Sequence, residues 1–253
     1  MPDRDKPENL RLDELLVLRG LFVSRSRARD AIMRGTVRVD GVEAAKPGIA
    51  VSEAAAIEVD DPARGFVARS ALKLLAGLDQ FGFDPDGRSV LDMGASTGGF
   101  TQVLLQRGAR CVFAVDVGHG QLHSGLASDQ RVIVLEGLNA RDLVASHLDG
   151  IAPEAIVADM SFISLKLALP PALCLAAPGA WAALLVKPQF EAGREAIGKG
   201  GLLRRPEEGP RVAADLREWL DIQPGWRAID LVPSPIHGGD GNREFLLGGV
   251  KDR

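Results

Sequence analysis

Short runs of apolar residues recur along most of the chain, each bounded by turn residues. Five of them predict strands, over residues 89–93, 111–115, 132–135, 156–158 and 181–186. Continuous apolar runs of this length are typical of strands that are buried on both faces of a parallel sheet. Helix-like segments separate them, so the pattern predicts an α/β domain with helices on both faces of the sheet.

The end of the chain departs from this alternation. The pattern predicts a helix over 205–220, then strands near 228–232 and 244–247. Only the loop 233–243 separates these two strands, which leaves no room for a crossover helix and predicts an antiparallel pair. We therefore expect a Rossmann-like sheet of seven strands that is mostly parallel and has an antiparallel last strand.

The first 61 residues follow a different pattern. Leu12 and Leu15 share one face of a predicted helix, and Ser24 is a good cap for a second helix. Residues 36–42 and 56–59 then predict a β-hairpin and a further strand. The expected organisation is a small α+β domain over 1–61, a linker over 62–68 and a second domain over 69–253.

One uncharged stretch, residues 167–186, is nominally long enough to span a bilayer. Three prolines and a glycine inside it would interrupt a spanning helix, so the stretch predicts a helix, a turn and a buried strand instead. The charged first eight residues lack the apolar core of a secretory signal. We therefore expect a cytoplasmic protein with no membrane partner.

The charge balance excludes a globally basic nucleic-acid-binding protein. The chain has 30 Lys and Arg against 34 Asp and Glu, a formal net charge of −4. Residues 19–38, however, contain six arginines and a single acid, Asp30. A basic surface is therefore predicted for the first domain, and this surface would suit a phosphate backbone.

The strongest local signal is the glycine-rich segment 91–100, Leu-Asp-Met-Gly-Ala-Ser-Thr-Gly-Gly-Phe, which follows the first predicted strand of the sheet. Glycines there let the backbone approach a nucleotide cofactor at the carboxyl edge of the sheet. The spacing is not the G-x-G-x-x-G of a dehydrogenase. Asp116 ends the next strand and would suit a ribose hydroxyl of either a nicotinamide or an S-adenosylmethionine cofactor.

Four charged residues are predicted to converge at the same edge. Asp159 and Lys187 each follow a parallel strand, Glu244 begins the antiparallel last strand, and Lys73 lies in the helix-like segment 69–77. Such a cluster suits methylation of a weakly acidic hydroxyl, which must be oriented and lose its proton during attack. Neighbouring carboxylates oppose the lowered pKa that a lysine base needs, so the pattern leaves the choice of base open.

Other candidates are weaker. His119 and His123 are four residues apart but have no evident third metal ligand. Cys111 and Cys174 match neither a disulfide framework nor a metal site. The glycine-rich loop 187–205 contains five basic residues and is either a substrate-facing loop or a solvated one.

Several motifs together resemble a known family. Residues 11–13 (Arg-Leu-Asp) and 37–41 (Val-Arg-Val-Asp-Gly) resemble the RNA-binding domain of the ribosomal protein S-four type. The second part resembles, in order, the motifs of TlyA-type proteins, which are related to the FtsJ (RrmJ) ribose 2′-O-methyltransferases. These motifs occupy residues 94–100, 116–122, 161–165, 186–191 and 241–245.

This resemblance implies a class I methyltransferase that uses S-adenosylmethionine, releases S-adenosylhomocysteine and needs no metal. It carries a catalytic tetrad over to Lys73, Asp159, Lys187 and Glu244, with Lys187 as the base. The implied cofactor-binding residues are Gly94, Ala95, Ser96, Thr97, Gly98, Gly99, Phe100, Asp116, Asn139 and Asp159. The implied RNA-binding residues are Arg11, Arg19, Arg25, Arg27, Arg29, Arg34 and Arg38, with Phe162 beside the catalytic pocket.

The implied substrate is the ribose 2′-hydroxyl of cytidine in 16S or 23S ribosomal RNA, within 30S or 50S subunits. One departure lies around Lys73, where residues 68–74 lack the glycines that the family tends to have. Three alternatives stay open: a membrane-active hemolysin, a non-catalytic ribosome-binding factor, and a methyltransferase that acts on a protein or a small molecule.

Overall fold

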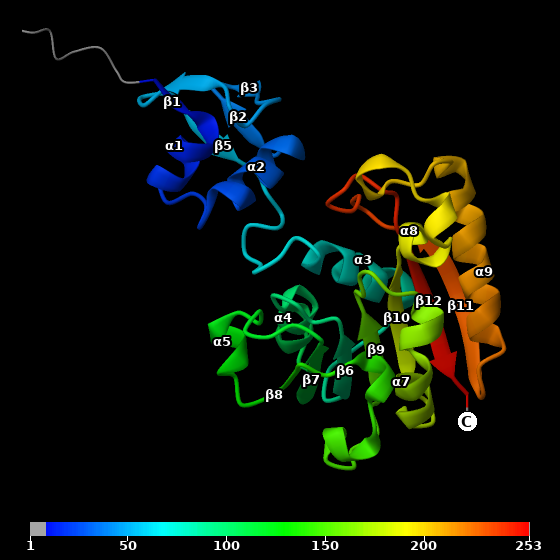
Figure 1. Cartoon of the computed structure of the whole chain (residues 1–253). Coiled ribbons are helices and arrows are strands. Elements are labelled where there is room, and N and C mark those ends of the chain that lie inside the picture. Colours follow the sequence, from blue (N-terminus) through cyan, green and yellow to red (C-terminus); the bar gives the residue numbers. More distant parts are fainter. Residues whose placement is uncertain (1–8, 253) are drawn as a thin grey trace, which may run out of the picture. The chain divides into compact units, whose positions relative to one another are not determined.

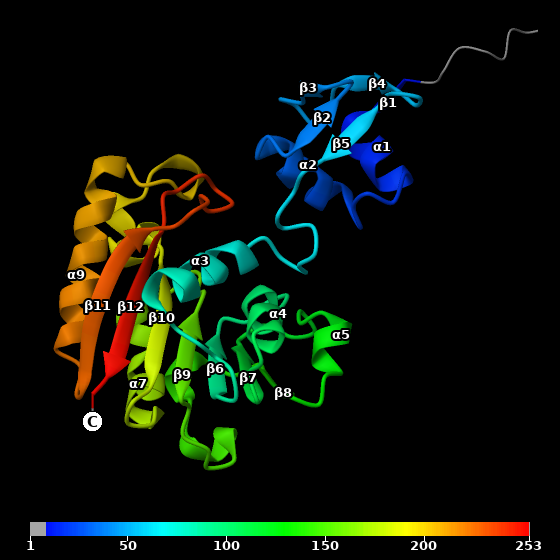
Figure 2. The same cartoon turned by 180° about the vertical axis from the view of Figure 1, so that it is seen from behind.

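The computed structural model describes residues 9–252, so the expectation for the first eight residues lies outside the described part of the chain. The structure divides into two compact units, Met1–Gly65 and Phe66–Arg253. The linker expected over 62–68 spans this division. Figures 1 and 2 show both units from opposite sides.

The first unit packs two helices against two small antiparallel sheets. Its core is formed by Leu12, Leu15, Phe22 and Ile32. Ser24 caps the second helix as expected, because its Oγ accepts a hydrogen bond from the backbone N–H of Arg27 at 3.3 Å. The elements are β1 (Asn9–Arg11), α1 (Leu12–Leu18), α2 (Arg25–Met33), β2 (Val37–Val39), β3 (Val42–Glu43), β4 (Ala50–Ser52) and β5 (Ile57–Val59).

Strands β2, β3 and β5 form the hairpin and the further strand that the sequence predicts. The pairing of β1 with β4 was not predicted. β1 and β4 have only three residues each, too few for an alternating pattern to be recognised.

The second unit is built on one seven-stranded sheet of order β11-β12-β10-β9-β6-β7-β8. Its strands are β6 (Ser89–Met93), β7 (Cys111–Asp116), β8 (Val132–Glu136), β9 (Ala155–Ala158), β10 (Trp181–Val186), β11 (Trp226–Pro233) and β12 (Phe245–Lys251). β12 runs antiparallel to both of its neighbours, β10 and β11. The predicted Rossmann-like sheet with an antiparallel last strand is therefore confirmed.

Helices cover both faces of this sheet, as Figures 1 and 2 show. Leu173 of α7 and Leu216 of α9 belong to the core on one face, and Leu74 of α3 and Val103 of α4 to the core on the other. The helices are α3 (Ala71–Phe81), α4 (Gly99–Gln106), α5 (Ser124–Ala127), α6 (Leu165–Ala168), α7 (Pro170–Leu175), α8 (Pro188–Glu191) and α9 (Gly209–Asp221). The described residues also form 3₁₀ turns, η1 (Ala140–Asp142) and η2 (Ala145–Leu148) between β8 and β9, and η3 (Arg194–Ala196), η4 (Lys199–Gly201) and η5 (Pro206–Glu208) between α8 and α9.

Two predicted helix boundaries were wrong. The helix expected to end at Gly77 continues to Phe81, because the body of the helix tolerates a glycine that packs against Leu246. It ends at Gly82, whose φ of 67° is left-handed. The helix expected from residue 205 starts at Gly209, since Pro206–Glu208 form a 3₁₀ turn.

The uncharged stretch 167–186 is broken into α6, α7, a turn and β10, as predicted. Within residues 9–252, every helix is too short or too polar to cross a membrane.

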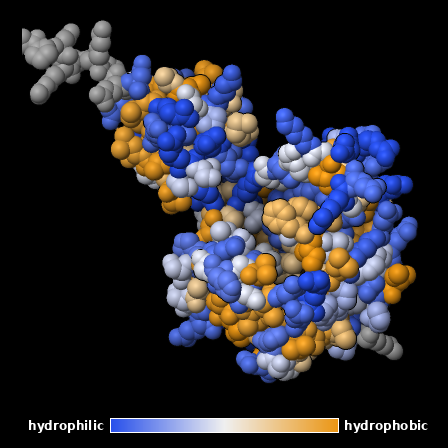
Figure 3. Space-filling view, in the orientation of Figure 1, coloured by the Kyte–Doolittle hydropathy of each residue, from blue (hydrophilic) through white to orange (hydrophobic). Residues whose placement is uncertain are grey.

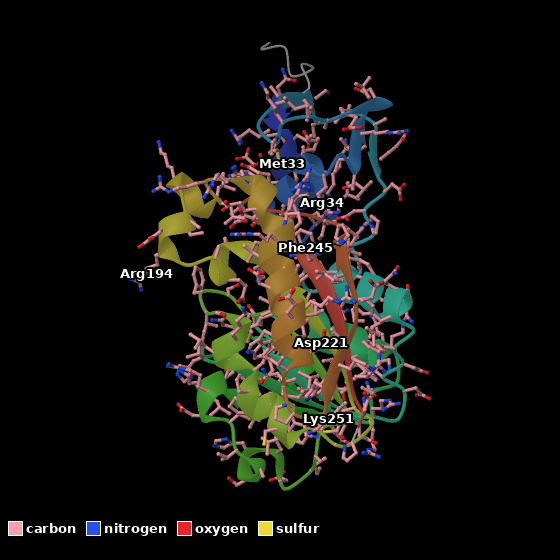
Figure 4. All side chains as sticks on the ribbon, turned by 90° about the vertical axis from the view of Figure 1, so that its right-hand side faces the viewer. Met33, Arg34, Arg194, Asp221, Phe245 and Lys251 are labelled. Atoms are coloured by element: carbon pink, nitrogen blue, oxygen red, sulfur yellow. The ribbon has the colours of Figure 1, made fainter. Side chains whose placement is uncertain are left out.

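On the face drawn in Figure 3, hydrophobic side chains lie among hydrophilic ones. Figure 4 marks the two ends of β12 with Phe245 and Lys251. Lys251 Nζ donates hydrogen bonds to the carbonyls of Leu173, Cys174 and Ala176, at 3.1, 3.3 and 2.6 Å.

Candidate active site

The register of the sheet brings together residues that are distant in the sequence. Val186, the last residue of β10, pairs with Phe245, the first residue of β12. Lys187 and Glu244 are the next residues beyond this pair, so both lie at the carboxyl edge of the parallel strands. Asp159 follows β9, the other neighbour of β10, at the same edge.

Lys73 and Glu244 form a buried ion pair. Lys73 lies in the first turn of α3, and its Nζ donates a short hydrogen bond to Glu244 Oε2. The two side chains are 6% and 2% exposed. Burial raises the pKa of Glu244 above its ordinary value, against the opposing attraction of Lys73 and Lys187. Each charge therefore depends on the other for compensation.

Lys187 and Asp159 form a second pair beside the first. Lys187 Nζ lies 2.6 Å from Asp159 Oδ1 and donates a hydrogen bond to Ser161 Oγ at 2.8 Å. These two charged side chains are 11% and 17% exposed, so they are more accessible than the inner pair. The site thus has a buried pair and a partly open pair of ammonium and carboxylate groups.

The glycine-rich turn after β6 lies directly against the Asp159 segment. Gly94 has a φ of 83°, and a Cβ there would lie 2.8 Å from the carbonyl oxygen of Asp159. Glycine is therefore required both for the backbone conformation and for the close approach. Gly98 and Gly99 pack behind the turn, where a Cβ would lie 2.4 Å from the Leu126 side chain and from Ser70 Oγ, respectively.

Asp116 ties the glycine turn to the segment after β7. Its Oδ2 accepts a hydrogen bond from the Ser96 N–H and its Oδ1 accepts one from the Gly118 N–H, both at 2.8 Å. Asp92 lies behind the turn and is fully buried, with Thr101 Oγ1 donating to its Oδ2 at 2.7 Å. Burial raises the pKa of Asp92 to about 7 despite that hydrogen bond.

Two neighbouring cavities open over this edge. The larger, about 480 Å³, is lined by the turn after β6 and the segments after β7, β8 and β9. The smaller, about 230 Å³, is lined by Arg69, Ser70, Thr97, Phe100 and Lys187 among others. Gly94, Ser96, Asp159 and Ser161 line both cavities. An elongated ligand can therefore lie across the turn, with one end beside Lys187 and Asp159.

The second unit matches a family model over nearly its whole length. The model is that of the FtsJ-like methyltransferases and covers residues 66–251, while an S4 domain model covers residues 10–57. The chain belongs to the FtsJ-like methyltransferase family, in the TlyA group.

Members of this family align with the chain over both units. The 16S/23S rRNA (cytidine-2′-O)-methyltransferase TlyA of Mycobacterium tuberculosis is 45% identical over 94% of this chain and 88% of its own length. Hemolysin A of Brachyspira hyodysenteriae is 36% identical over 94% of this chain and 98% of its own length. A solved structure described as a hemolysin from Streptococcus thermophilus superposes with a TM-score of 0.74 at 37% identity, over 97% of this chain and 90% of its own.

The structure brings the four residues of the expected FtsJ-like tetrad into two contacting pairs. Among the expected cofactor residues, Gly94, Ser96, Asp116, Asn139 and Asp159 line the larger cavity. Ala95, Thr97 and Phe100 line the smaller one. Asn139 Oδ1 accepts hydrogen bonds from the backbone N–H and the Nε of Arg141, at 3.1 and 3.2 Å, which fixes its orientation at the rim.

Two polar residues of the site were missed. Glu136 ends β8, and its carboxylate accepts hydrogen bonds from the N–H groups of Gly120, Gln121 and Leu122 at 2.6, 3.0 and 3.2 Å. The bonds from Gly120 and Leu122 hold the pKa of Glu136 below its ordinary value. Asp116 was identified because it ends a predicted strand, and the same criterion could have identified Glu136. Ser161 lay in a quoted motif but was given no role.

The arginines of the first unit differ in their partners. Arg11 and Arg25 each pair with Asp13, at 3.1 and 3.0 Å, and Asp13 is fully buried. Burial would raise the pKa of Asp13, but the hydrogen bonds from these two arginines hold it below its usual value. Arg34 donates to both carboxylate oxygens of Asp61, at 2.8 and 2.9 Å.

The other arginines of the expected set are exposed or donate hydrogen bonds to backbone carbonyl groups. Arg29 and Arg38 are exposed. Arg19 donates a short hydrogen bond to the Glu53 carbonyl, and Arg27 donates to the Ala63 carbonyl at 2.9 Å. Of the two histidines considered as metal ligands, His123 has a local structural role. Its Nδ1 accepts a hydrogen bond from the Gly125 N–H at 3.2 Å and caps α5.

Proposed function

We propose that the chain is an S-adenosylmethionine-dependent methyltransferase that modifies the ribose 2′-hydroxyl of cytidine in ribosomal RNA. The observation that carries the proposal is the pair of lysine–carboxylate contacts beside a glycine cradle, in a chain 45% identical to a protein named for that reaction. RNA is the polymer that offers a 2′-hydroxyl. The enzyme would meet ribosomal subunits in the cytoplasm.

The residues present fit the cofactor. Gly94 lines both cavities, and its lack of a side chain lets the glycine-rich turn pack directly against the backbone of Asp159. The larger cavity combines polar groups, among them Asp116, Gln121 and Asn139, with apolar side chains such as Val115 and Leu138, as a nucleoside requires. When bound, S-adenosylmethionine supplies a methyl group that is already activated for displacement and needs no metal.

The tetrad would divide the work on the acceptor. Lys187 Nζ lies at the open end of the site and, as the neutral amine formed after its own proton has passed to solvent, takes the proton that leaves the 2′-oxygen. Asp159 and Ser161 hold Lys187 on two sides. Lys73 and Glu244 form the buried wall behind it and contribute a fixed arrangement of charge.

RNA would be held by both units, each through its own groups. The exposed Arg29 and Arg38 suit phosphate contacts, with Arg11, Arg19, Arg25 and Arg27 at the same small unit. Arg34 is the weakest of the set, because Asp61 already binds both terminal nitrogens of its guanidinium and Asp30 binds its Nε. In the second unit, Phe162 is 92% exposed beside the larger cavity and can stack on an unpaired base. The loop after α8 adds Arg194, which points away from the body of the unit in Figure 4.

The test is transfer of radiolabelled methyl groups from S-adenosylmethionine to purified, unmethylated 30S and 50S subunits. We expect label in RNA that resists alkaline cleavage at the modified nucleotide, and the labelled subunit identifies the target. Lys187→Ala should abolish transfer while cofactor binding persists. The matched control is Arg107→Ala, directly after α4, which removes an exposed pair with Asp79 of α3. Full activity of Lys187→Ala would remove the base assignment.

The competing functions give different results in the same preparation. A ribosome-binding factor without turnover binds subunits but leaves no label. A methyltransferase for another acceptor labels a protein or a small molecule in an extract while both subunits stay unlabelled. A membrane-active protein, the activity that the name of the Brachyspira relative suggests, releases dye from liposomes.

A further inference from the structure

Two loops carry the partly open half of the site, and they touch at several points. The loop after β9 contains Asp159, Ser161 and Phe162, and the segment after β10 contains Lys187 and α8. Lys187 Nζ contacts Asp159 and Ser161 at the start of the loop. In the middle of the loop after β9, the ring of Phe162 contacts the ring of Phe190, with 5.3 Å between the ring centroids.

The far end of the same loop is held by Glu191, the last residue of α8. Ser164 Oγ donates to Glu191 Oε2 at 2.5 Å, and the Leu165 N–H donates to Glu191 Oε1 at 2.8 Å. Both carboxylate oxygens are therefore used on the two residues that begin α6. Burial raises the pKa of Glu191 above its ordinary value, although these two hydrogen bonds oppose the change.

The backbone between these contacts needs an anchor. Phe162 has a φ of 66°, a left-handed conformation that is strained for a residue with a bulky side chain. Its ring is 92% exposed, so packing of the side chain contributes little to holding that conformation. Besides the ring contact with Phe190, the conformation of Phe162 is therefore maintained from its two ends, by Lys187 on Ser161 and by Glu191 on Ser164 and Leu165.

We propose that Glu191 is a positioning residue for methyl transfer, holding the loop after β9 so that Phe162 and Asp159 stay aligned with Lys187 around the acceptor nucleotide. This inference rests on the proposed function. Glu191 does not touch the reacting atoms; it acts through the loop. A glutamine can make the same two contacts, because its carbonyl accepts one hydrogen bond and its amide donates the other to the Ser164 hydroxyl.

The experiment compares Glu191→Ala, Glu191→Gln and the control Glu195→Ala, an exposed glutamate four residues further on. Loss of two hydrogen bonds to a half-buried carboxylate should lower kcat/KM for the ribosomal subunit by about tenfold or more in Glu191→Ala. Affinity for S-adenosylmethionine should change by less than about threefold, and Glu191→Gln should recover most of the activity. Amide hydrogen exchange of residues 160–168 should accelerate in the alanine variant only.

Two results would overturn the inference. One is an alanine variant with unchanged kcat/KM and unchanged exchange in residues 160–168. The other is a parallel loss of cofactor affinity and activity with faster exchange throughout the unit, which indicates a merely structural role. If Glu191→Ala does not fold, Ser164→Ala removes one of the two contacts together with the N-cap hydrogen bond from the Lys166 N–H, and unchanged exchange of residues 160–168 in that variant refutes the role of Glu191 in holding the loop. If the wild-type protein labels neither subunit, the proposed function fails, while the exchange measurement still decides whether Glu191 orders the loop.

Discussion

The Lys73–Glu244 pair has a structural role that can be separated from the role in methyl transfer that we propose for it. Removing one partner leaves an uncompensated charge among side chains that are 6% and 2% exposed. Breaking such a buried pair costs about 3–5 kcal/mol in free energy of unfolding. We therefore expect Glu244→Leu and Lys73→Met each to lower the melting temperature by roughly 6–20 °C, at about 2–4 °C per kcal/mol for a chain of this size.

The double variant Lys73→Met/Glu244→Leu should behave differently from either single one. Replacing both charges with apolar groups of similar volume is often neutral or stabilising, so stability should return to within about 1 kcal/mol of the wild type. Methyl transfer should stay absent, because both polar groups are gone. All three tryptophans, Trp181, Trp219 and Trp226, lie in the second unit, so their fluorescence follows the unfolding of that unit alone.

Single variants that lose less than about 1 kcal/mol would refute this reasoning, because they would show that solvent already compensates the charges. A double variant whose loss equals the sum of the two single losses would refute it as well. Such additivity would mean that the two side chains do not interact energetically.

Two further perturbations test the cofactor side of the site. The pKa of Asp92 is raised in the folded state to about 7, from an ordinary value of 3.8. The contribution of Asp92 to stability is therefore fully present below pH 3.8 and is lost as the pH rises toward 7. A shift of about three pH units, at about 1.4 kcal/mol each, makes this loss roughly 4 kcal/mol. Asp92→Asn should remove this loss, so that its urea midpoint exceeds that of the wild type at pH 8 but not at pH 4. Glu136→Gln should weaken S-adenosylmethionine binding by about tenfold, measured by calorimetry. The reason is that a neutral amide holds the three N–H groups of residues 120–122 less strongly than a carboxylate does. Unchanged affinity would show that cofactor binding does not depend on this anchor.

The parallel strands could be predicted closely because their burial leaves a direct mark on the sequence. β6 and β10 have the bounds that the apolar runs predict, since strands covered on both faces cannot include exposed polar positions. The antiparallel direction of β12 followed from the length of the loop before it. From these two facts alone, Asp159, Lys187 and Glu244 could be assigned to one edge.

What the sequence could not supply was the pairing of side chains within the site. Composition does not distinguish an arrangement in which Glu244 binds Lys73 from one in which it binds Lys187. Register and helix orientation decide this, and both depend on how α3 packs against β10 and β12. The same holds for Arg34, which counts as one of six clustered arginines in the sequence but is held by Asp61, a residue 27 positions away.

The order of the strands also bears on how the enzyme is made. β12 comes after β10 and β11 in the chain, yet it lies between them, so the sheet has a gap until β12 has been synthesised. Lys73 is synthesised 171 residues before Glu244, the partner that neutralises it. A nascent or prematurely terminated chain therefore has a complete glycine cradle but an unfinished catalytic wall. Methyl transfer therefore has to wait until β12 has been synthesised and inserted between β10 and β11.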